Sequence, residues 1–282
     1  NSIAATLRNL GDRTGAEPYY RRALDIYRKR LGPAHPRLAT MLQNLASLRH
    51  DLGDLDEAAA LFEEALAMQA SLTGGDDLNT STILSNVANL QIERGQMEEA
   101  EASARKALNI RERLQGPQSP QVGLSKGNLA SILIKRGRHD EAEPLLEEAL
   151  AIYRAAFGER HPNVAAIYRN QAQIAIDRGS PVQAETLIRE ALSIYAEKVP
   201  TNIELRARCN FTLAAVLEMQ GRRDEAQEVL IQTHADLGAL PDLAKVQEMA
   251  RAQLEKLYLD WGREADAQHW AAPGGQPVVG GG

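Results

Sequence analysis

The stretch GRHDEAEPLLEEALAIY (137–153) is the clearest copy of a pattern that returns throughout the chain. A glycine opens it, acidic residues follow, and Ala142 and Ala149 stand seven residues apart among leucines and isoleucine. The apolar residues recur at the three- and four-residue spacing of one helix face. Acidic side chains in a first helical turn suit the positive end of the helix dipole. The stretch therefore predicts a turn followed by an amphipathic helix.

The same pattern recurs with a step of 42 residues, and no insertion or deletion interrupts its six copies. A step of this length is typical of stacked supersecondary units that bury their apolar faces against one another. The alanines let two helices approach closely, because a bulky side chain at the contact would overpack it. Four series of small residues share the step: Gly11, Gly53, Gly95, Gly137, Gly179 and Gly221; Ala16, Ala58, Ala100, Ala142, Ala184 and Ala226; Ala4, Ala46, Ala88, Ala130, Ala172 and Ala214; and Ala23, Ala65, Ala107, Ala149 and Ala191.

One repeat, residues 120–158, predicts a pair of antiparallel helices. Pro120 is tolerated in a first helical turn, and Ser119 before it is a typical N-cap. Gly137 ends the first helix and supplies the turn. The first helix carries its apolar residues at helical spacing, and these are Leu124, Leu129, Ile132 and Leu133. His35 and His161 each precede a proline at a repeat start, and we interpret both as helix-start residues and not as metal ligands.

Composition excludes several classes of protein. Of the 282 residues, 44 % are hydrophobic, 25 % charged and 4 % aromatic, which favours a soluble protein with an Ala- and Leu-rich helical core. The net charge of −6 gives no basic surface for nucleic acid. A single cysteine, Cys209, excludes an internal disulfide framework and favours a reducing, cytoplasmic compartment. No apolar run reaches the roughly 18 residues of a membrane span, and no signal peptide opens the chain.

The order of small residues resembles the tetratricopeptide repeat (TPR), as Ala46, Gly53, Ala58 and Ala65 illustrate. The 42-residue step and the phrase LGPAHP (31–36) are similar to the kinesin light chain branch of that family. The resemblance covers residues 1–236 and continues to 270, where GREADAQ (262–268) echoes GRRDEAQ (221–227). The family's tryptophan is absent, its tyrosine is replaced, and Thr212 stands where asparagine is expected. The heptad segment of kinesin light chains is absent too, so the resemblance implies no motor-adaptor role.

The resemblance implies an all-α fold, a right-handed α-solenoid of antiparallel helical hairpins. The chain starts with Asn1 where a helix is expected to be under way, and we interpret it as a fragment of a longer protein. We expect a final helix at 242–261, with Leu254, Leu257, Leu259 and Trp261 covering the last core face. The expected divisions are a truncated first repeat at 1–31, repeats at 32–73, 74–115, 116–157 and 158–199, a sixth repeat at 200–236 that is degenerate at its end, a C-terminal capping helix and partial repeat at 237–271, and a flexible Gly/Pro-rich tail at 272–282.

Catalytic and metal-binding signatures are absent from the sequence. The six histidines lie apart, without HExxH or a Cys/His pairing, and no GxGxxG, GxxxxGK[ST] or GxSxG occurs. We interpret Cys209 as a small buried apolar residue. We interpret the paired glutamates at 63–64, 98–99 and 147–148 as solvated helix faces. We therefore expect no enzyme activity, no cofactor and no metal.

A recurring asparagine gives the best candidate site. It stands in QNLASL (43–48), SNVANL (85–90), GNLASI (127–132) and RNQAQI (169–174), inside predicted first helices. The resemblance implies that first helices line a concave groove suited to an extended peptide. A carboxamide has two donors and an acceptor, so it can hold a peptide main chain without reading side chains. The candidate groove residues are Gln43, Asn44, Ser47, Asn86, Asn89, Asn128, Ser131, Lys135, Arg169, Asn170, Gln173 and Arg208.

Two questions about this groove stay open at the level of sequence. The amides could instead bond within their own helix or the next one, or they could be a remnant of repeat duplication. The charges expected in the groove balance, so they leave the charge of the partner open: Arg8, Lys135, Arg169 and Arg208 against Asp51, Glu93, Asp177 and Glu218.

The sequence thus predicts a protein–protein interaction scaffold that binds a peptide or protein segment in its groove, with no nucleic acid and no membrane as partner. Two alternatives remain. The repeats could be the regulatory or sensor array of a larger bacterial signalling protein, with a covalently linked ATPase or caspase-like protease domain outside this stretch. They could also form a homo-oligomer, with self-association as the function.

Overall fold

The computed structural model describes residues 2–31, 34–238 and 243–271, the side chain of Asn9 excepted. These residues form fourteen helices and no strand, which confirms the predicted all-α class. The expected tail at 272–282 lies outside the described residues. The chain divides into two compact units, Asn1–Ile152 (unit 1) and Tyr153–Gly282 (unit 2).

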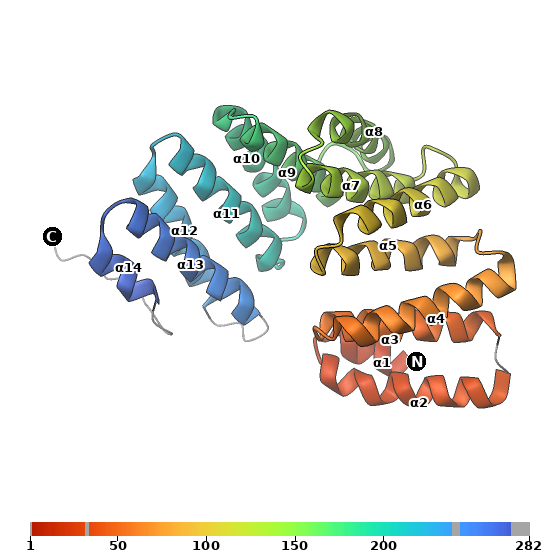
Figure 1. The fold of residues 1–282 in the computed structure, drawn as a ribbon. Coiled ribbons are helices and arrows are strands. Elements are labelled where there is room, and N and C mark those ends of the chain that lie inside the picture. Colours follow the sequence, from red (N-terminus) through yellow and green to blue (C-terminus); the bar gives the residue numbers. More distant parts are fainter. Residues whose placement is uncertain (1, 32–33, 239–242, 272–282) are drawn as a thin grey trace. The chain divides into compact units, whose positions relative to one another are not determined.

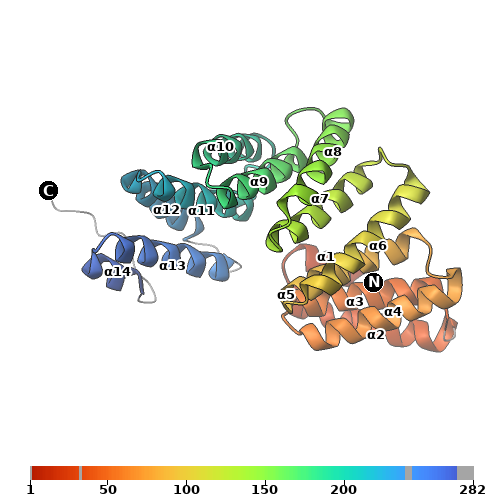
Figure 2. The ribbon, with the colours of Figure 1, turned by 45° about the horizontal axis from the view of Figure 1, so that its top comes forward.

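Unit 1 consists of consecutive helical hairpins (Figure 1). Within it α3 packs on α4 and α5 on α6, and each hairpin also contacts the next, through α2 with α3, α4 with α5 and α6 with α7. Figure 2 shows the α5–α6 pair from a second direction. The helices are α1 (Ser2–Asn9), α2 (Arg13–Leu31), α3 (Pro36–Asp51), α4 (Leu55–Thr73), α5 (Leu78–Glu93), α6 (Met97–Gln115), α7 (Pro120–Lys135) and α8 (His139–Phe157), which runs on beyond Ile152.

Unit 2 repeats the arrangement. The pairs α9–α10, α11–α12 and α13–α14 pack as hairpins, and α10 contacts α11 as α12 contacts α13. Its helices are α9 (Pro162–Asp177), α10 (Pro181–Lys198), α11 (Ile203–Met219), α12 (Arg223–Leu237), α13 (Ala244–Asp260) and α14 (Glu264–Ala271). In both units we call α1, α3, α5, α7, α9, α11 and α13 first helices, and the helix that follows each of them a second helix.

The turn inside each hairpin depends on its glycine. Gly137, between α7 and α8, has a φ of +72°, in the left-handed region that side chains rarely adopt. A Cβ built on Gly137 meets nothing within 4 Å, so backbone conformation and not crowding requires the glycine. The other glycines of the series share the positive φ: Gly11, Gly53, Gly95, Gly179 and Gly221.

The alanine series lies at the helix contacts, as predicted. Ala142 is fully buried, and so are Ala46 and its neighbour Leu45, at 0 % and 1 % exposure. Cys209 is also fully buried, and burial raises the pKa of its thiol to about 11. Small side chains at these contacts let paired helices approach, and larger apolar residues fill the space beside them.

The predicted helix starts are confirmed. Ser119 Oγ accepts a hydrogen bond from the backbone N–H of Val122 at 3.3 Å. His35 and His161 are N-caps, each accepting through Nδ1 from the N–H two residues on, at 3.1 Å and 3.2 Å. Both histidines therefore satisfy free N–H groups of a first turn.

The C-terminal part corrects one expectation. Leu254 and Leu257 of α13 are buried at 0 % and 1 %, but Leu259 is 52 % exposed and Trp261 is half-buried at the C-cap. At about 100° per residue, Leu259 lies about 200° around the helix from Leu257, so both cannot face the core. The apolar stripe that α13 buries is therefore narrower than the apolar residues in its sequence indicate.

Candidate partner-binding face

The candidate residues all lie on first helices. In unit 1 they belong to α3, α5 and α7, and in unit 2 to α9 and α11. We call the surface that they mark the first-helix face of each unit. In unit 1 it carries Gln43, Asn44, Ser47, Asn86, Asn89, Asn128, Ser131 and Lys135; in unit 2 it carries Arg169, Asn170, Gln173 and Arg208.

Polar contacts join neighbouring first helices of unit 1 on this face. Arg8 of α1 forms an ion pair with Asp51 of α3 at 2.7 Å. One repeat later His50 of α3 has its Nε2 3.1 Å from a carboxylate oxygen of Glu93 in α5. Three of these groups were expected to face the groove, whereas His50 was missed. The signal was available, because His50 stands 42 residues after Arg8.

The recurring asparagines are all half-buried, but their side chains differ in what they bind. Asn86 Nδ2 lies 3.5 Å from Ser47 Oγ on the preceding first helix, at the limit of a hydrogen bond. Asn170 has an interaction partner as well. Among the described residues, the carboxamides of Asn44 and Asn128 have none. Bonds between described residues therefore engage two of the four amides and not the other two.

Some of the remaining candidate side chains already have a polar partner, whereas others have none. Arg208 donates to Glu204 one turn earlier at 2.8 Å and 3.1 Å, and Gln173 donates to Asp177 at 2.8 Å. Lys135 is exposed and Arg169 half-buried, and no hydrogen bond or ion pair within the described part of the chain engages either. Counting four cations against four anions therefore does not show which of these charges can still bind a ligand.

An apolar residue also belongs to this face. Leu124 of α7 is 48 % exposed and stands four residues before Asn128, so both lie on one side of the helix. The sequence pattern grouped Leu124 with the apolar stripe of its helix. The helix in fact buries Leu129, Ile132 and Leu133 and leaves Leu124 to solvent.

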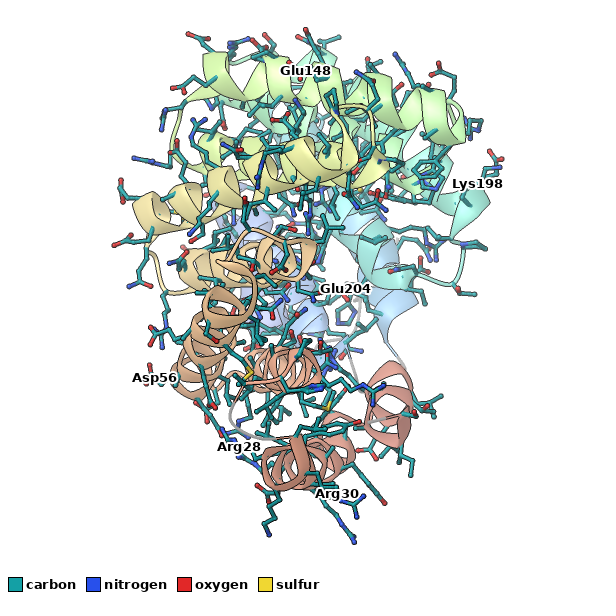
Figure 3. All side chains as sticks on the ribbon, turned by 90° about the vertical axis from the view of Figure 1, so that its right-hand side faces the viewer. Arg28, Arg30, Asp56, Glu148, Lys198 and Glu204 are labelled. Carbon is teal, nitrogen blue, oxygen red and sulfur yellow. The ribbon has the colours of Figure 1, made fainter. Side chains whose placement is uncertain are left out.

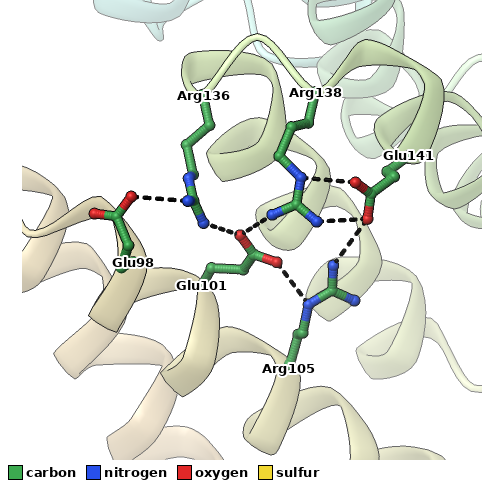
Figure 4. A network of polar contacts seen from close by, with 6 residues as sticks. All are labelled: Glu98, Glu101, Arg105, Arg136, Arg138 and Glu141. Carbon is green, nitrogen blue, oxygen red and sulfur yellow. Dashed lines mark hydrogen bonds and ion pairs between the residues drawn. The ribbon is translucent and has the colours of Figure 1, made fainter.

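A second polar set links consecutive repeats through their second helices (Figure 4). Glu101 of α6, only 7 % exposed, accepts hydrogen bonds from Arg105 on its own helix and from Arg136 and Arg138 after α7. Arg138 also donates to Glu141 of α8, with distances of 2.6 Å and 2.7 Å. Burial alone would raise the pKa of Glu101, but the bonds from Arg105 and Arg138 outweigh it and lower that pKa. We call this set the Glu101 network.

The same set recurs 84 residues later, which is two repeats. In unit 2 Glu185 accepts from Arg189, Gln220 and Arg222, at 2.8 Å, 2.9 Å and 2.7 Å. Glu17, which stands 84 residues before Glu101, likewise accepts from Arg21 at 2.9 Å. This glutamate–arginine pair therefore occurs in every second repeat. The intervening repeats have Glu63 and Glu147 at the position of the arginine.

The paired glutamates lie on exposed helix faces, as expected, and one member of each pair also binds a cation. Glu64 of α4 pairs with Arg28 of α2 at 2.6 Å, and Glu98 of α6 with Arg136 at 2.8 Å. Glu148 of α8 pairs with Lys126, whose ammonium also lies 2.8 Å from Glu112. Figure 3 labels charged side chains of both kinds: Arg30 projects from α2, whereas Asp56 of α4 pairs with Arg94. Glu64, Glu98 and Glu148 thus bind cations on neighbouring elements while remaining exposed.

The described residues hold no group of three or more His, Cys, Asp or Glu side chains that could bind a metal ion. Within the same part of the chain, no helix is long and apolar enough to cross a membrane.

Comparison with known proteins defines the family. A tetratricopeptide repeat model matches residues 1–71, 43–113, 79–155 and 122–197, and a second one matches 207–230. Among curated protein sequences, none matches the chain significantly.

Solved structures show the same fold at low sequence identity. BtubC (BKLC) from P. vanneervenii has a TM-score of 0.62 and 24 % identity, over 83 % of this chain and 91 % of that one. The kinesin light chain-like protein of Podosopora anserina, with nearly identical TPR-like repeats, has a TM-score of 0.54 and 23 % identity, over 67 % and 90 %. The STAND protein PH0952 of Pyrococcus horikoshii, a signal transduction ATPase with a tetratricopeptide repeat sensor, has a TM-score of 0.67 and 13 % identity, over 96 % and 40 %.

The resemblance to kinesin light chain-like repeats and the solenoid class are thereby confirmed. With tetratricopeptide models covering residues 1–197, the chain belongs to the tetratricopeptide repeat family, whose members are typically non-enzymatic protein–protein interaction scaffolds.

Proposed function

We propose that this protein binds a peptide or protein segment along the first-helix face of a unit, and that the recurring asparagines on that face hold the main chain of the segment. The observation that supports this most is the state of Asn44 and Asn128. Both carboxamides are half-buried, and neither has a partner among the described residues. A main-chain N–H and C=O supply the donor and the acceptor that each amide lacks.

The remaining residues of the face suit such a ligand. Ser131 stands one helical turn after Asn128, and Leu124 one turn before it, so polar and apolar contacts alternate along α7. A side chain of the ligand can pack on Leu124 while the amide holds the backbone. Capture of a short segment in this way is expected at about micromolar Kd, or about −8 kcal/mol.

A peptide-library pull-down tests the proposal. The triple variant Asn86→Ala, Asn128→Ala and Asn170→Ala removes three amides from the two first-helix faces, and the double variant Asn44→Ala with Asn128→Ala removes the two unpartnered ones. Each lost hydrogen bond is expected to weaken binding by about 0.5–1.5 kcal/mol. Asn109→Ala is the matched control, because Asn109 is exposed on the second helix α6. If the variants fold and retain every partner at wild-type affinity, the asparagines do not bind the segment.

A second candidate is a sensor array of a larger signalling protein. Nearly the whole chain superposes on part of a STAND ATPase with a tetratricopeptide repeat sensor, covering 96 % of this chain and 40 % of that one. The intact protein, isolated from its source, tests this by its mass and its ATPase activity. A mass near the 30.8 kDa of this sequence removes the candidate.

A further inference from the structure

A pocket of about 240 Å³ opens in unit 2. Its lining residues belong to the helices α10, α11 and α12, which Figure 1 labels. Its apolar wall includes Leu192 and Ala196 of α10 and Ile203 of α11. None of the twelve candidate residues of the first-helix faces lines it. The pocket is thus separate from the proposed peptide site. A ligand can occupy the pocket whether or not a peptide is bound to the first-helix face.

The pocket lies where the sixth repeat departs from the earlier ones at two core positions. Arg206 of α11 and Asp236 of α12 both line it. At the position of Arg206 the four preceding copies have buried residues, namely Leu38, Thr80, Val122 and Val164. At the position of Asp236 they have Met68, Ile110, Ile152 and Ile194, also buried. Two side chains that fill the core elsewhere are here replaced by a cation and an anion.

The two charges do not neutralise each other. Within the described part of the chain no ion pair joins Arg206 to Asp236, and the buried Nε of Arg206 has no hydrogen-bond partner. Asp236 is exposed and accepts a bond from Gln232 at 2.7 Å. Asn210 and Thr233 are bonded to each other at 3.0 Å. The guanidinium of Arg206 is therefore the polar group of the pocket that has no partner among the described residues.

We propose that this pocket binds an aliphatic α-amino acid. Its carboxylate accepts hydrogen bonds from Arg206, whose planar fork matches a carboxylate. Its aliphatic side chain packs on Leu192 and Ile203, and its ammonium group faces Asp236. At about 240 Å³ the pocket is smaller than the roughly 300–1,000 Å³ of sites for drug-sized ligands, which favours a ligand the size of a single amino acid.

Calorimetric titration of the full chain with three probes tests this assignment. L-leucine is expected to bind saturably at one site. 4-Methylpentanoate lacks the ammonium group and L-leucinamide lacks the carboxylate, so each is expected to bind at least about tenfold more weakly. Absence of saturable L-leucine binding overturns the proposal. Equal binding of 4-methylpentanoate or of L-leucinamide also overturns it, because one of the two charged contacts is then not made.

A double variant locates the site. Arg206→Val with Asp236→Ile restores the residue types that the earlier repeats bury, so it is expected to fold and to melt no lower than the wild type. Its affinity for L-leucine should fall at least about tenfold. Arg223→Ala is the control, because Arg223 is exposed on α12 and does not line the pocket. Wild-type binding by the double variant overturns the proposal, and so does an equal loss in Arg223→Ala. Peptide binding along the first-helix face stays unchanged in either case.

Discussion

Arg138 and Glu101 are joined across the junction of two repeats, with Arg138 Nη1 2.5 Å from Glu101 Oε2. Arg138 stands in the turn before α8, whereas Glu101 lies on the preceding second helix, α6. Because Arg138 also binds Glu141, one guanidinium ties α6 to α8. The contact therefore stabilises the stacking of repeats and not the individual hairpin.

Removing the charge of Glu101 should weaken this junction. Glu101→Gln leaves three arginines around an amide that can satisfy only part of their donors, in a nearly buried place. We expect a loss of about 1–3 kcal/mol in the free energy of unfolding, read from thermal denaturation by circular dichroism. Glu99→Gln, at an exposed position of the same helix, is the control. Equal melting of the two variants would show that the network contributes no stability.

The same networks predict how stability depends on pH. The pKa values of Glu101 and Glu185 are lowered in the folded state, since the arginine and glutamine bonds outweigh the opposing effect of burial. Their contribution is complete above the unfolded glutamate pKa of about 4.3 and is lost as the pH falls through the lower folded values. Burial raises the pKa of Glu218, which acts in the opposite direction.

We therefore expect the melting temperature to fall on acidification below about pH 4.3, and to fall less in a Glu101→Gln, Glu185→Gln variant. Melting curves at a series of pH values measure this difference. Parallel curves for wild type and variant would contradict the assignment of the acid-side loss to these two groups.

A charge placed at the contact of paired helices should disrupt unit 1. Ala142 is 0 % exposed, and Ala142→Arg introduces both excess volume and a cation without a partner. Overpacking alone costs about 1–3 kcal/mol, and the desolvated charge adds to that cost. Ala151→Arg, on an exposed position of the same helix, should melt close to wild type. An unmoved melting temperature in Ala142→Arg would contradict the repeat register, which puts Ala142 at the contact between helices.

The turn glycine gives a graded prediction. At Gly137 the φ of +72° is strained for alanine, so Gly137→Ala is expected to cost about 1–2 kcal/mol. Gly137→Asn should cost less, because asparagine adopts this conformation more readily and the space around the Cβ is open. Chemical denaturation of both variants measures the order. A loss in Gly137→Asn that equals or exceeds the loss in Gly137→Ala would indicate a cause other than φ.

Much of the fold could be predicted from sequence because its determinants are local and repeated. Gly137 permits the left-handed backbone conformation of the turn, and Ser119 caps the helix that follows it. The 42-residue step then places the alanines on matching faces of successive helices. It also places the asparagines on first helices, since helical periodicity alone decides which residues share a face.

Tertiary structure decided how these groups pair, because the partners come from helices far apart in the sequence. Arg138 reaches Glu101 37 residues earlier, and Asn86 reaches Ser47, while among the described residues Asn44 and Asn128 stay unpartnered. The pocket beside Arg206 also needs Asp236 on the paired helix α12, because the aspartate does not fill the core as the apolar residues of earlier repeats do. Sequence by itself thus determined the repeat and which residues share a face of each helix. Packing between helices decided which polar groups remain free to bind a partner.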